Sequence, residues 1–348
     1  MNKVSAYQWC VVGAGPAGIL MIGKLLDQGI DPKSILWLDP DFKVGDLGCE
    51  WQNVPSNTRV VYFNEFLSYA KSFDYESCPD NCSIRSLNEG NTCILGNMAN
   101  TLQWVSDHLS EKVVSIKAKV NSLNMFNACW NIKTDEKIFS AKRVVVAVGA
   151  EPIELNEYPE LPTVSLKKAL DPEKLKTLVS HLDHVAVFGS SHSAVLILKA
   201  LNELGIKATN FYRSPIRYAV QLDDCILYDN TGLKGTTAEW ARKHLSGELP
   251  ENLERVNTND QHFKEKLKAC NKAIYAVGFN RRTIAIDGQL EISHDPKTGI
   301  IAPGLYGLGL AYPELVVDKF GREEWNVGLF KFSNYLEKVF PLWLLYPI

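Results

Sequence analysis

The stretch that decides the fold is Gln8–Asp39, QWCVVGAGPAGILMIGKLLDQGIDPKSILWLD. Its first apolar run, Trp9–Val12, stops at the glycine-rich turn 13–18, after which apolar residues recur at helical spacing. A second apolar run, Ile35–Leu38, ends the stretch at an aspartate. The pattern therefore predicts a strand, a tight turn, a helix and a second strand, which is the βαβ unit of a dinucleotide-binding domain.

Each glycine of this turn has its own predicted role. Gly13 makes the tight turn, Gly15 lets the backbone approach a pyrophosphate, and Gly18 lets helix and strand pack closely. The N–H groups at the start of the helix, together with its positive dipole end, then face the diphosphate. Asp39 follows Gly18 by about twenty residues, where an acid accepts hydrogen bonds from an adenosine ribose. The predicted pyrophosphate contacts are Gly13, Gly15, Pro16, Ala17 and Gly18.

Length and composition limit the class of protein. With 348 residues, of which 46% are hydrophobic, the chain is long enough for two domains with sizeable cores. Its net charge of −3 and the absence of a basic block exclude a nucleic-acid partner. The first strand begins too early to leave room for a secretory signal, and no apolar run is long enough for stable membrane insertion. Eight scattered cysteines predict reduced thiols in a cytoplasmic protein, and no metal site is expected.

The polar segment 40–59 leaves the carboxyl end of the second strand, where the reactive end of a bound dinucleotide is expected. Its Cys49 is a candidate redox thiol facing the cofactor, and the alternative is a structural cysteine. Helices are predicted over 60–73 and 97–109. Further along, strands are predicted over 113–123 and 129–134, and the buried strand from Val144 ends at Gly149. A glycine there would let the chain pass close to a bound cofactor.

The opening pattern returns after a proline-rich segment at 152–162. The apolar run Val185–Phe188 leads into a second turn, GSSHSA, and then into a predicted helix over 195–204 and a strand over 208–212. This second βαβ unit has Ser191 in place of the middle glycine, so a dinucleotide must lie farther out or use hydroxyl contacts. The alternative is a purely structural repeat. The predicted nucleotide contacts are Gly189, Ser190, Ser191, His192 and Ser193.

The residues after the second unit indicate which nucleotide it takes. Arg213 and Ser214 stand where the first unit has Asp39. An acid there would bind the 2′-hydroxyl of NAD and repel a 2′-phosphate, whereas a guanidinium binds that phosphate through paired, charge-assisted hydrogen bonds. The prediction is therefore NADPH, and the alternative for Arg213 is a solvated surface side chain.

The last part of the chain returns to the first domain. The strand 273–277 precedes this return, and a strand within 299–311 ends in small residues. A helical pattern from Trp325 through Phe340 is expected to point its N-terminus at the end of that strand. The final stretch Val339–Ile348 is strongly apolar but too short to span a bilayer. It is expected to pack against the body of the protein or against a second subunit, which would make a homodimer.

The order of these motifs resembles the two-dinucleotide-binding-domain flavoproteins, the pyridine nucleotide-disulfide oxidoreductase-like superfamily. Two glycine-rich βαβ units are separated by AVGAEP (147–152) and followed by YAVGF (275–279) and PGLYGLGLA (303–311). The resemblance implies an α/β fold with two Rossmann-like domains, the NAD(P)H domain (156–275) being inserted into an FAD domain formed by 1–155 and 276–348. It also implies that FAD contacts the first turn, Asp39, the Val120 backbone, Gly149, Gly309 and Leu310.

Within this superfamily the chain is most similar to flavin-containing and N-hydroxylating monooxygenases. SNTR (56–59) resembles their asparagine-threonine motif, and FYRSP (211–215) resembles the NADPH-binding stretch of related enzymes. The FxGxxxH signature of the family is missing. The implied activity uses NADPH to reduce FAD, which reacts with oxygen to a C4a-hydroperoxide that oxygenates a small molecule. Asn57 is then the hydrogen-bond partner of the peroxide and of the nicotinamide, unless it serves only its own backbone.

Two other functions stay open at this point. An NADPH-dependent flavin reductase would pass electrons to a quinone, a thiol or another acceptor, and Cys49 is the feature in its favour. A flavin-binding protein without turnover is favoured by Ser191. The substrate is not identified, because the segments 62–95 and 223–235, which are expected to shape the pocket, carry no recognisable specificity code.

Overall fold

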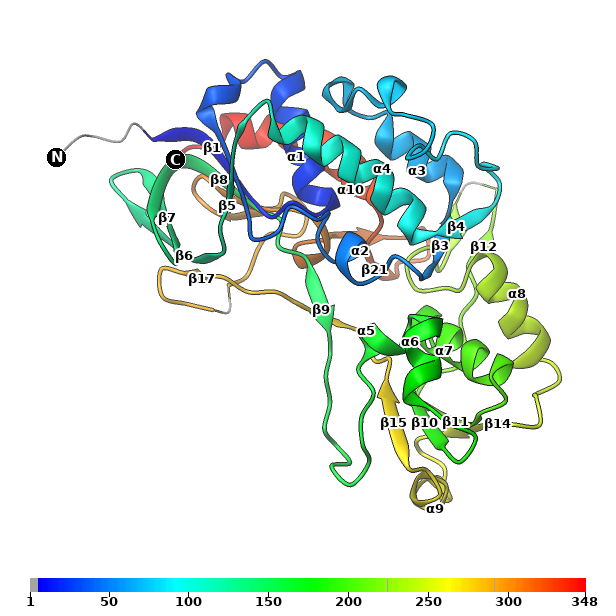
Figure 1. Cartoon of the computed structure of the whole chain (residues 1–348). Helices are drawn as coiled ribbons and strands as arrows, with labels where there is room; N and C mark the ends of the chain where they lie inside the picture. The colour runs from blue at the N-terminus through cyan, green and yellow to red at the C-terminus, as the bar shows by residue number, and fades with distance from the viewer. Residues whose placement is uncertain (1–5, 224, 291) are drawn as a thin grey trace.

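The computed structural model describes residues 6–223, 225–290 and 292–348. Its two main sheets lie in two adjoining lobes, and strand β1 and the last described helix, α10, both belong to the larger one (Figure 1). The smaller lobe is built on a parallel sheet, and the larger one on a mixed sheet in which β1 pairs parallel with β2 and β8 while β7 pairs antiparallel with β6 and β8. Helices pack against both sheets, as expected for strands that alternate with helices along the sequence.

The larger sheet has nine strands, ordered β17-β6-β7-β8-β1-β2-β5, with β19 on β8 and β18 on β19. Val12 at the end of β1 is in register with Leu38 of β2 and Val146 of β8, so these strands end at the same edge. The strands are β1 (Tyr7–Val12), β2 (Ile35–Asp39), β5 (Val114–Lys117), β6 (Val120–Phe126), β7 (Cys129–Thr134), β8 (Ile138–Val146), β17 (Ala285–Ile286), β18 (Ile300–Ala302) and β19 (Leu305–Gly307).

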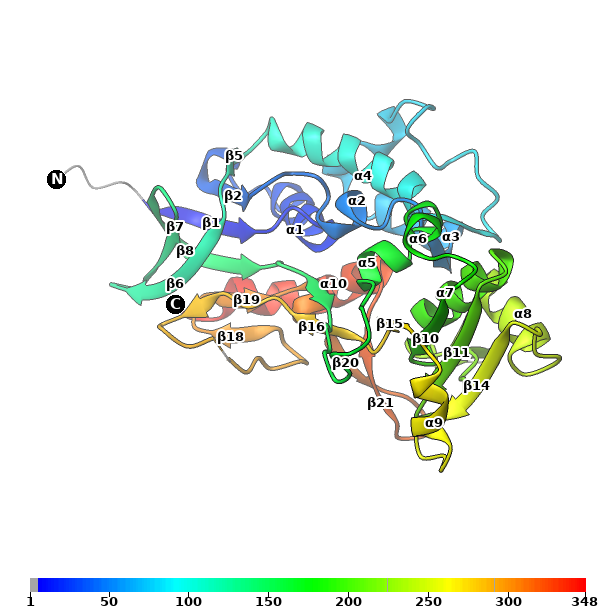
Figure 2. The ribbon, with the colours of Figure 1, turned by 60° about the horizontal axis from the view of Figure 1, so that its bottom comes forward.

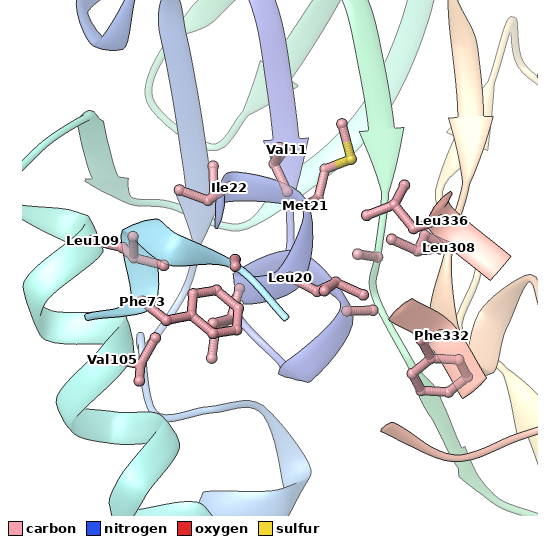
Figure 3. Packing of buried hydrophobic residues seen from close by; sticks show 14 of the residues in the cluster. Val11, Leu20, Met21, Ile22, Phe73, Val105, Leu109, Leu308, Phe332 and Leu336 are labelled. Carbon is pink, nitrogen blue, oxygen red and sulfur yellow. The ribbon is translucent and has the colours of Figure 1, made fainter. Parts of the chain in front are cut away.

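Helix α1 (Pro16–Asp27) is almost completely buried in this lobe, because other helices cover it on two sides. Figure 3 shows Phe73 and α4 (Leu95–Ser110) on one side of α1, and Leu308 with α10 (Leu329–Leu345) on the other. Helix α3 (Val60–Leu67) packs on α10. The predicted first unit is thus the centre of the core, which explains why its helix is apolar on nearly all faces.

The smaller lobe contains the second predicted unit. Its four parallel strands lie in the order β14 (Leu253–Asn257), β11 (Lys207–Tyr212), β10 (His184–Phe188) and β15 (Lys272–Tyr275). Apolar side chains of this sheet and its helices form a core of their own. The helices of this lobe are α5 (Leu166–Ala169), α6 (Pro172–Leu178), α7 (His192–Glu203), α8 (Gly235–His244) and α9 (Phe263–Lys268).

The chain crosses between the lobes twice, through β9 (Ala150–Pro152) and β16 (Phe279–Arg281). These two short strands pair antiparallel and run alongside each other (Figure 2). The second domain is therefore inserted into the first, which confirms the predicted α/β fold with two Rossmann-like domains. The boundaries given for the domains, 155/156 and 275/276, stay predictions.

Short elements complete the two lobes. They include helix α2 (Asp46–Cys49) and three antiparallel pairs of strands: β3 (Pro55–Arg59) with β4 (Thr92–Ile94), β12 (Val220–Gln221) with β13 (Ile226–Leu227), and β20 (Glu314–Val317) with β21 (Glu323–Asn326). The prediction of a helix beginning at Trp325 is wrong at its start. Trp325 pairs with Leu315 in the β20–β21 hairpin. Helix α10 begins only at Leu329, because Gly328 before it has a φ of 143°, which is not a helical conformation.

The C-terminal apolar stretch packs against the body of the protein. Phe340 lies against Trp9, and the ring of Trp343 stacks on Tyr306 at 4.7 Å between centroids. Within residues 6–223, 225–290 and 292–348, no helix has both the length and the apolar character needed to cross a bilayer.

Candidate functional site

The first glycine turn separates residues that the fold requires from one that it does not. A Cβ on Gly13 would lie 2.4 Å from the Ala147 carbonyl oxygen, and one on Gly18 would lie 1.9 Å from the Gly13 oxygen. Gly15 has an ordinary φ of −75°, and no atom would lie closer than 4.0 Å to its Cβ. Packing therefore explains Gly13 and Gly18, whereas the space in front of Gly15 at the start of α1 suits the close approach of a ligand.

The last motif of the chain returns to this turn. Gly309 has a φ of 83°, and a Cβ on it would lie only 2.6 Å from the Ala17 Cβ, so Gly309 touches the first turn of α1. Leu310 beside it is 50% exposed, which is unusual for a leucine at the centre of a fold. The structure thus brings Pro16, Ala17, Gly309 and Leu310 to one place, as the flavin prediction requires.

Asp39 has a structural role that the sequence did not reveal. Its Oδ1 accepts hydrogen bonds from the N–H groups of Asp41 (2.9 Å) and Phe42 (2.7 Å), and its Oδ2 accepts one from Ala14 N–H (2.7 Å). The carboxylate therefore joins the glycine turn to the following loop. Since each carboxylate oxygen can accept about two hydrogen bonds, Oδ2 keeps one position for a ribose hydroxyl.

Two further predicted contacts lie at or near the ends of strands, Val120 at the start of β6 and Gly149 after β8. Val120 opens β6, and Ala118 just before it donates its N–H to the Asp39 carbonyl at 3.0 Å. Gly149 adopts a φ of 72° and lies beside Arg282. A Cβ added to Gly149 would be 3.5 Å from the Arg282 Nη1.

Arg282 itself was missed by the sequence analysis. Its Nη2 donates to Asp46 Oδ2 at 2.7 Å, so it ties the strand after the second crossing to the α2 loop. Only the fold brings these two residues together.

The second turn repeats the first with conservative changes. Gly189 has a φ of 127°, and a Cβ there would lie 2.3 Å from the Ala276 carbonyl oxygen, just as Gly13 faces Ala147. Ser191 is the N-cap residue of α7, yet its side chain makes no capping bond, so the hydroxyl is left for another partner. Ser190 and Ser193 on either side are half-buried. The arrangement fits a phosphate bound through N–H groups and hydroxyls.

His192 has one ring nitrogen without a partner. Its Nε2 lies 3.3 Å from the Pro55 carbonyl oxygen, whereas Nδ1 is buried and has no hydrogen-bond partner among the described residues. Burial lowers the pKa of His192, so the ring is neutral at pH 7. With the Nε2 proton donated to Pro55, Nδ1 is an acceptor that a nucleotide donor would satisfy.

Arg213 and Ser214 lie just beyond β11, at the edge where the second turn begins. Gly189 N–H donates to the Phe211 carbonyl at 2.9 Å, which places Arg213 two residues past that contact. Both side chains are exposed, and no ion pair or hydrogen bond within the described residues engages the Arg213 guanidinium. This guanidinium is therefore available for a 2′-phosphate.

Asn57 lines a cavity of about 610 Å³ between the two lobes. It lies on β3 and is exposed, and its Oδ1 accepts a long hydrogen bond of 3.3 Å from Thr58. Its side-chain amide thus keeps N–H donors for a ligand. The cavity is bounded by β3, by the start of α3, by the β4 region, by α8 with the segment before it, and by the start of α10.

Cys49 lies apart from that cavity, at the exposed end of α2. It lines another cavity, of about 1070 Å³. Burial, and then the charges of Asp41, Asp46 and Glu50, raise the pKa of its thiol. A redox or nucleophilic thiol needs the opposite shift, because the thiolate is the reactive form. The predicted catalytic role of Cys49 therefore has no electrostatic support.

Two dinucleotide-binding units of this kind, one inserted into the other, define the class of two-domain flavoproteins. Solved structures share the fold at low identity. The FAD-bound cadaverine monooxygenase DfoA of Erwinia amylovora has a TM-score of 0.65 at 12% identity, covering 99% of this chain and 96% of that one. A steroid monooxygenase bound to NADP has a TM-score of 0.60 at 13%, covering 97% and 84%. Thioredoxin reductase of Lactococcus lactis has 0.57 at 13%, covering 97% and 99%.

No protein-family model matches the chain. Its sequence is 31% identical to the monooxygenase AgnR1 of Paecilomyces divaricatus over 393 aligned positions, which cover 98% of this chain and all of AgnR1. The chain therefore belongs to the monooxygenase family that includes AgnR1. The predicted class of enzyme, a monooxygenase-like oxidoreductase, is confirmed.

Proposed function

We propose that the protein is an FAD-dependent, NADPH-using monooxygenase that acts on a small molecule in the cavity beside Asn57. The observation that carries this proposal is the duplicated turn: Gly13 and Gly189 make the same backbone contact in two domains, at the start of two helices. Two dinucleotide sites in one monooxygenase call for a flavin and a nicotinamide nucleotide. The FAD and NADP bound by the structural neighbours support the same pair.

FAD is assigned to the first turn because Gly15 leaves space that the fold does not need. In this proposal the N–H groups at the start of α1 hold the pyrophosphate, Asp39 Oδ2 holds the ribose, and the Val120 backbone holds the adenine. Gly309 and Leu310 bring the end of β19 beside the flavin. When bound, FAD supplies the acceptor for hydride from NADPH and the means of activating oxygen.

NADPH is assigned to the second turn. Ser190, Ser191 and Ser193 would replace the missing glycine by hydroxyl contacts with the phosphates, and His192 Nδ1 would accept a hydrogen bond. Arg213 would bind the 2′-phosphate with Ser214 beside it. The hydrogen-bond distance between His192 and Pro55 shows that this turn lies next to β3, the strand that carries Asn57.

Asn57 is proposed to donate a hydrogen bond to the reacting oxygen in a site that excludes water. A preorganised donor of this kind contributes about 3 kcal/mol to the stabilisation of developing charge. Asn57→Leu should therefore keep its cofactor and still oxidise NADPH, but release hydrogen peroxide instead of oxygenated product. The measurement is peroxide formed per NADPH consumed, with a panel of small amines, ketones and aromatic compounds.

The control is Asn124→Leu, an exposed amide on β6 far from the cavity along the sheet, which should leave this ratio unchanged. If the wild type already releases one peroxide per NADPH with every compound, the protein does not oxygenate them, and a reductase that passes electrons to another acceptor takes its place. The raised pKa of the Cys49 thiol gives that reductase no further support.

Two finer proposals concern the surroundings of the enzyme. A cytoplasmic location is supported by the eight cysteines, none of which forms a disulfide in the described part of the chain. A homodimer is supported by exposed apolar residues at the end of α10, where Leu345 is 84% exposed. Sedimentation of the purified protein across a range of concentrations would test the dimer.

A further inference from the structure

The cavity beside Asn57 has an aromatic wall. The rings of Tyr62 and Phe330 stack at 4.9 Å between centroids with an angle of 21° between their planes, and both side chains are half-buried. Leu233, Val327 and Leu329 add apolar surface to the same cavity. A planar ring placed here would extend an existing stack, and such contacts favour aromatic ligands beyond the area they bury.

The cavity is also cationic, although the chain as a whole has a net charge of −3. Four cationic side chains and two carboxylates line it: Arg59, Lys234, Arg242, Lys331, Asp229 and Glu239. Lys331 and Lys234 both form ion pairs with the single carboxylate of Asp229, so this group of three side chains keeps a net positive charge. A concave surface with this balance concentrates anions.

Arg59 and Arg242 are the cationic side chains of the cavity that are not engaged in the ion pairs with Asp229. Arg59 lies over the ring of Tyr62, 5.2 Å from its centroid, and its Nη2 donates to the Tyr62 hydroxyl at 2.9 Å. Arg242 lies over the ring of Tyr218 at 4.5 Å. Neither guanidinium pairs with a carboxylate among the described residues. Each therefore keeps most of its N–H donors, in the planar arrangement that suits a carboxylate or another anionic oxygen.

The predicted nucleotide does not account for these arginines. No residue of the turn 189–193 lines the cavity, and neither does Arg213, so the phosphates of NADPH are expected elsewhere. Arg59 comes from β3 of the first domain, and Arg242 comes from α8 of the second. An anionic group bound by both arginines would therefore belong to a molecule that lies between the domains.

We propose that the substrate is an aromatic molecule carrying an anionic oxygen, either a carboxylate or an ionised acidic phenol. Its ring lies against Tyr62 and Phe330, and its anionic group lies between Arg59 and Arg242. This inference rests on the proposed function, because it takes the cavity beside Asn57 as the substrate site.

The test is calorimetric titration of the oxidised holoenzyme, without NADPH, using four probes of similar shape. These are 2-naphthoate, the acidic phenol 1-nitro-2-naphthol, the neutral 2-naphthamide and the cationic 2-naphthylmethylamine. At least one anion should bind about tenfold or more tightly than the amide, since a charge-assisted hydrogen bond contributes that much, and the amine should bind most weakly. The two anionic probes distinguish a carboxylate site from a phenolate site.

Variants then locate the anion. Arg59→Gln and Arg242→Gln should each weaken the preferred anion about tenfold and leave the amide nearly unchanged. The matched control is Lys243→Gln, which removes an exposed charge one residue along α8 and outside the cavity, and should change neither. Arg59→Lys keeps the charge but loses the planar fork, so it should fall between wild type and Arg59→Gln.

Equal binding of anions and amide by the wild type, tighter binding of the amine, or no binding of any anion would overturn the proposal. So would arginine variants that weaken the amide as much as the anion. Because the titration needs neither NADPH nor oxygen, its outcome is separate from the monooxygenase test. A charge preference without oxygenation would support the anion site in the cavity and remove the proposed function.

Discussion

Gly15 is a residue whose identity the folded chain alone does not explain. Its φ is accessible to any residue, and a Cβ would lie 4.0 Å from both the Gly45 Cα and the Val44 carbonyl oxygen, an ordinary contact without a clash. A larger side chain should therefore fold but block the close approach of the pyrophosphate. Gly15→Val is expected to purify without flavin, whereas wild type should carry about one FAD per chain, measured by the absorbance of the released cofactor.

The matched variant is Gly15→Ala, which adds one methyl group and should keep part of the flavin. Thermal unfolding of the flavin-free wild type and of Gly15→Ala should agree closely, because an added Cβ clashes with no atom of the chain. Full flavin content in Gly15→Val would show that the first turn is not the FAD site.

Arg213 is the residue that decides between the two nicotinamide nucleotides. Its exposed guanidinium is free in the described structure, so removing it should cost only what it gives to the 2′-phosphate. Arg213→Ala should weaken NADPH by about 2–3 kcal/mol relative to NADH, the contribution of a charge-assisted pair. The measurement is the Kd of each nucleotide from the change in flavin absorbance. An equal loss for both would indicate damage to the domain instead.

Arg217, the next arginine along the chain, provides the control. It already lies over the ring of Tyr228 at 5.3 Å, so Arg217→Ala should alter both nucleotides alike and only slightly.

Among the elements, the C-terminal helix α10 contributes more to the core than its place at the end of the chain suggests. Trp343 is fully buried, stacks on Tyr306 and donates its Nε1–H to the Thr298 carbonyl at 2.7 Å. Trp343→Ala should lower the free energy of unfolding by about 3–5 kcal/mol, as expected for a large buried aromatic residue. Urea denaturation followed by far-UV circular dichroism measures the loss.

The control is Trp325→Ala, which makes the same substitution at a residue that is 49% exposed. It should lower the free energy of unfolding by less than about 1 kcal/mol. A loss in Trp343→Ala as small as that in Trp325→Ala would mean that the end of α10 does not form part of the core.

The elements also show where sequence patterns suffice. Strand β1, helix α1 and strand β2 lie within a few residues of their predicted bounds, because apolar period and turn glycines agree there. The start of α10 could not be predicted, because Trp325 happens to fit the helical spacing of the apolar residues that follow it. Trp325 is extended because it pairs with Leu315 of β20. The local sequence around Trp325 does not reveal this partner strand.

The site was predictable to a similar extent. The positions of Gly13, Gly18 and Gly189 in tight turns could be predicted, because backbone geometry demands glycine there, whereas the nucleotide contacts of the glycines and serines stay predictions. The ion pair of Arg282 with Asp46, 236 residues apart, and the aromatic pair of Tyr62 and Phe330 were not predicted. These contacts join segments that only the tertiary fold brings together, and no local period marks them.

At the scale of the whole molecule, a polar cluster joins the second domain to the start of α10. The cluster consists of Asp229, Asn230, Glu324 and Lys331. Asn230 Oδ1 accepts from Lys331 Nζ at 2.6 Å, and Glu324 accepts from Asn230 N–H at 3.3 Å. Burial alone would raise the pKa of Asp229, but its hydrogen bonds with Lys234 and Lys331 hold that pKa below its usual range.

Asp229→Asn should destabilise the protein by about 3–5 kcal/mol, because it leaves Lys331 as a buried charge without a counterion. Thermal unfolding should recover in large part in the double variant Asp229→Asn with Lys331→Met, which removes the unpaired charge. A double variant no more stable than Asp229→Asn would contradict this account.

The same carboxylate makes the junction sensitive to acid. Since the folded pKa of Asp229 is lowered, its stabilising contribution is complete above about pH 4, the usual value for aspartate, and is lost as the pH falls through the lower folded pKa. Wild type should therefore lose more stability below pH 4 than the double variant does.

The paired strands β9 and β16 have a consequence for how such a protein can be rebuilt. The second domain enters and leaves through two segments held side by side, with Ala150 opposite Arg281 and Pro152 opposite Phe279. Because these two segments are adjacent, a different domain can be joined to the first domain here without a long linker. Exchange of the whole inserted domain as one piece is therefore expected to keep the native connectivity around the first turn, provided that the replacement keeps contacts such as those of His192 with Pro55 and of Asp229 with Lys331.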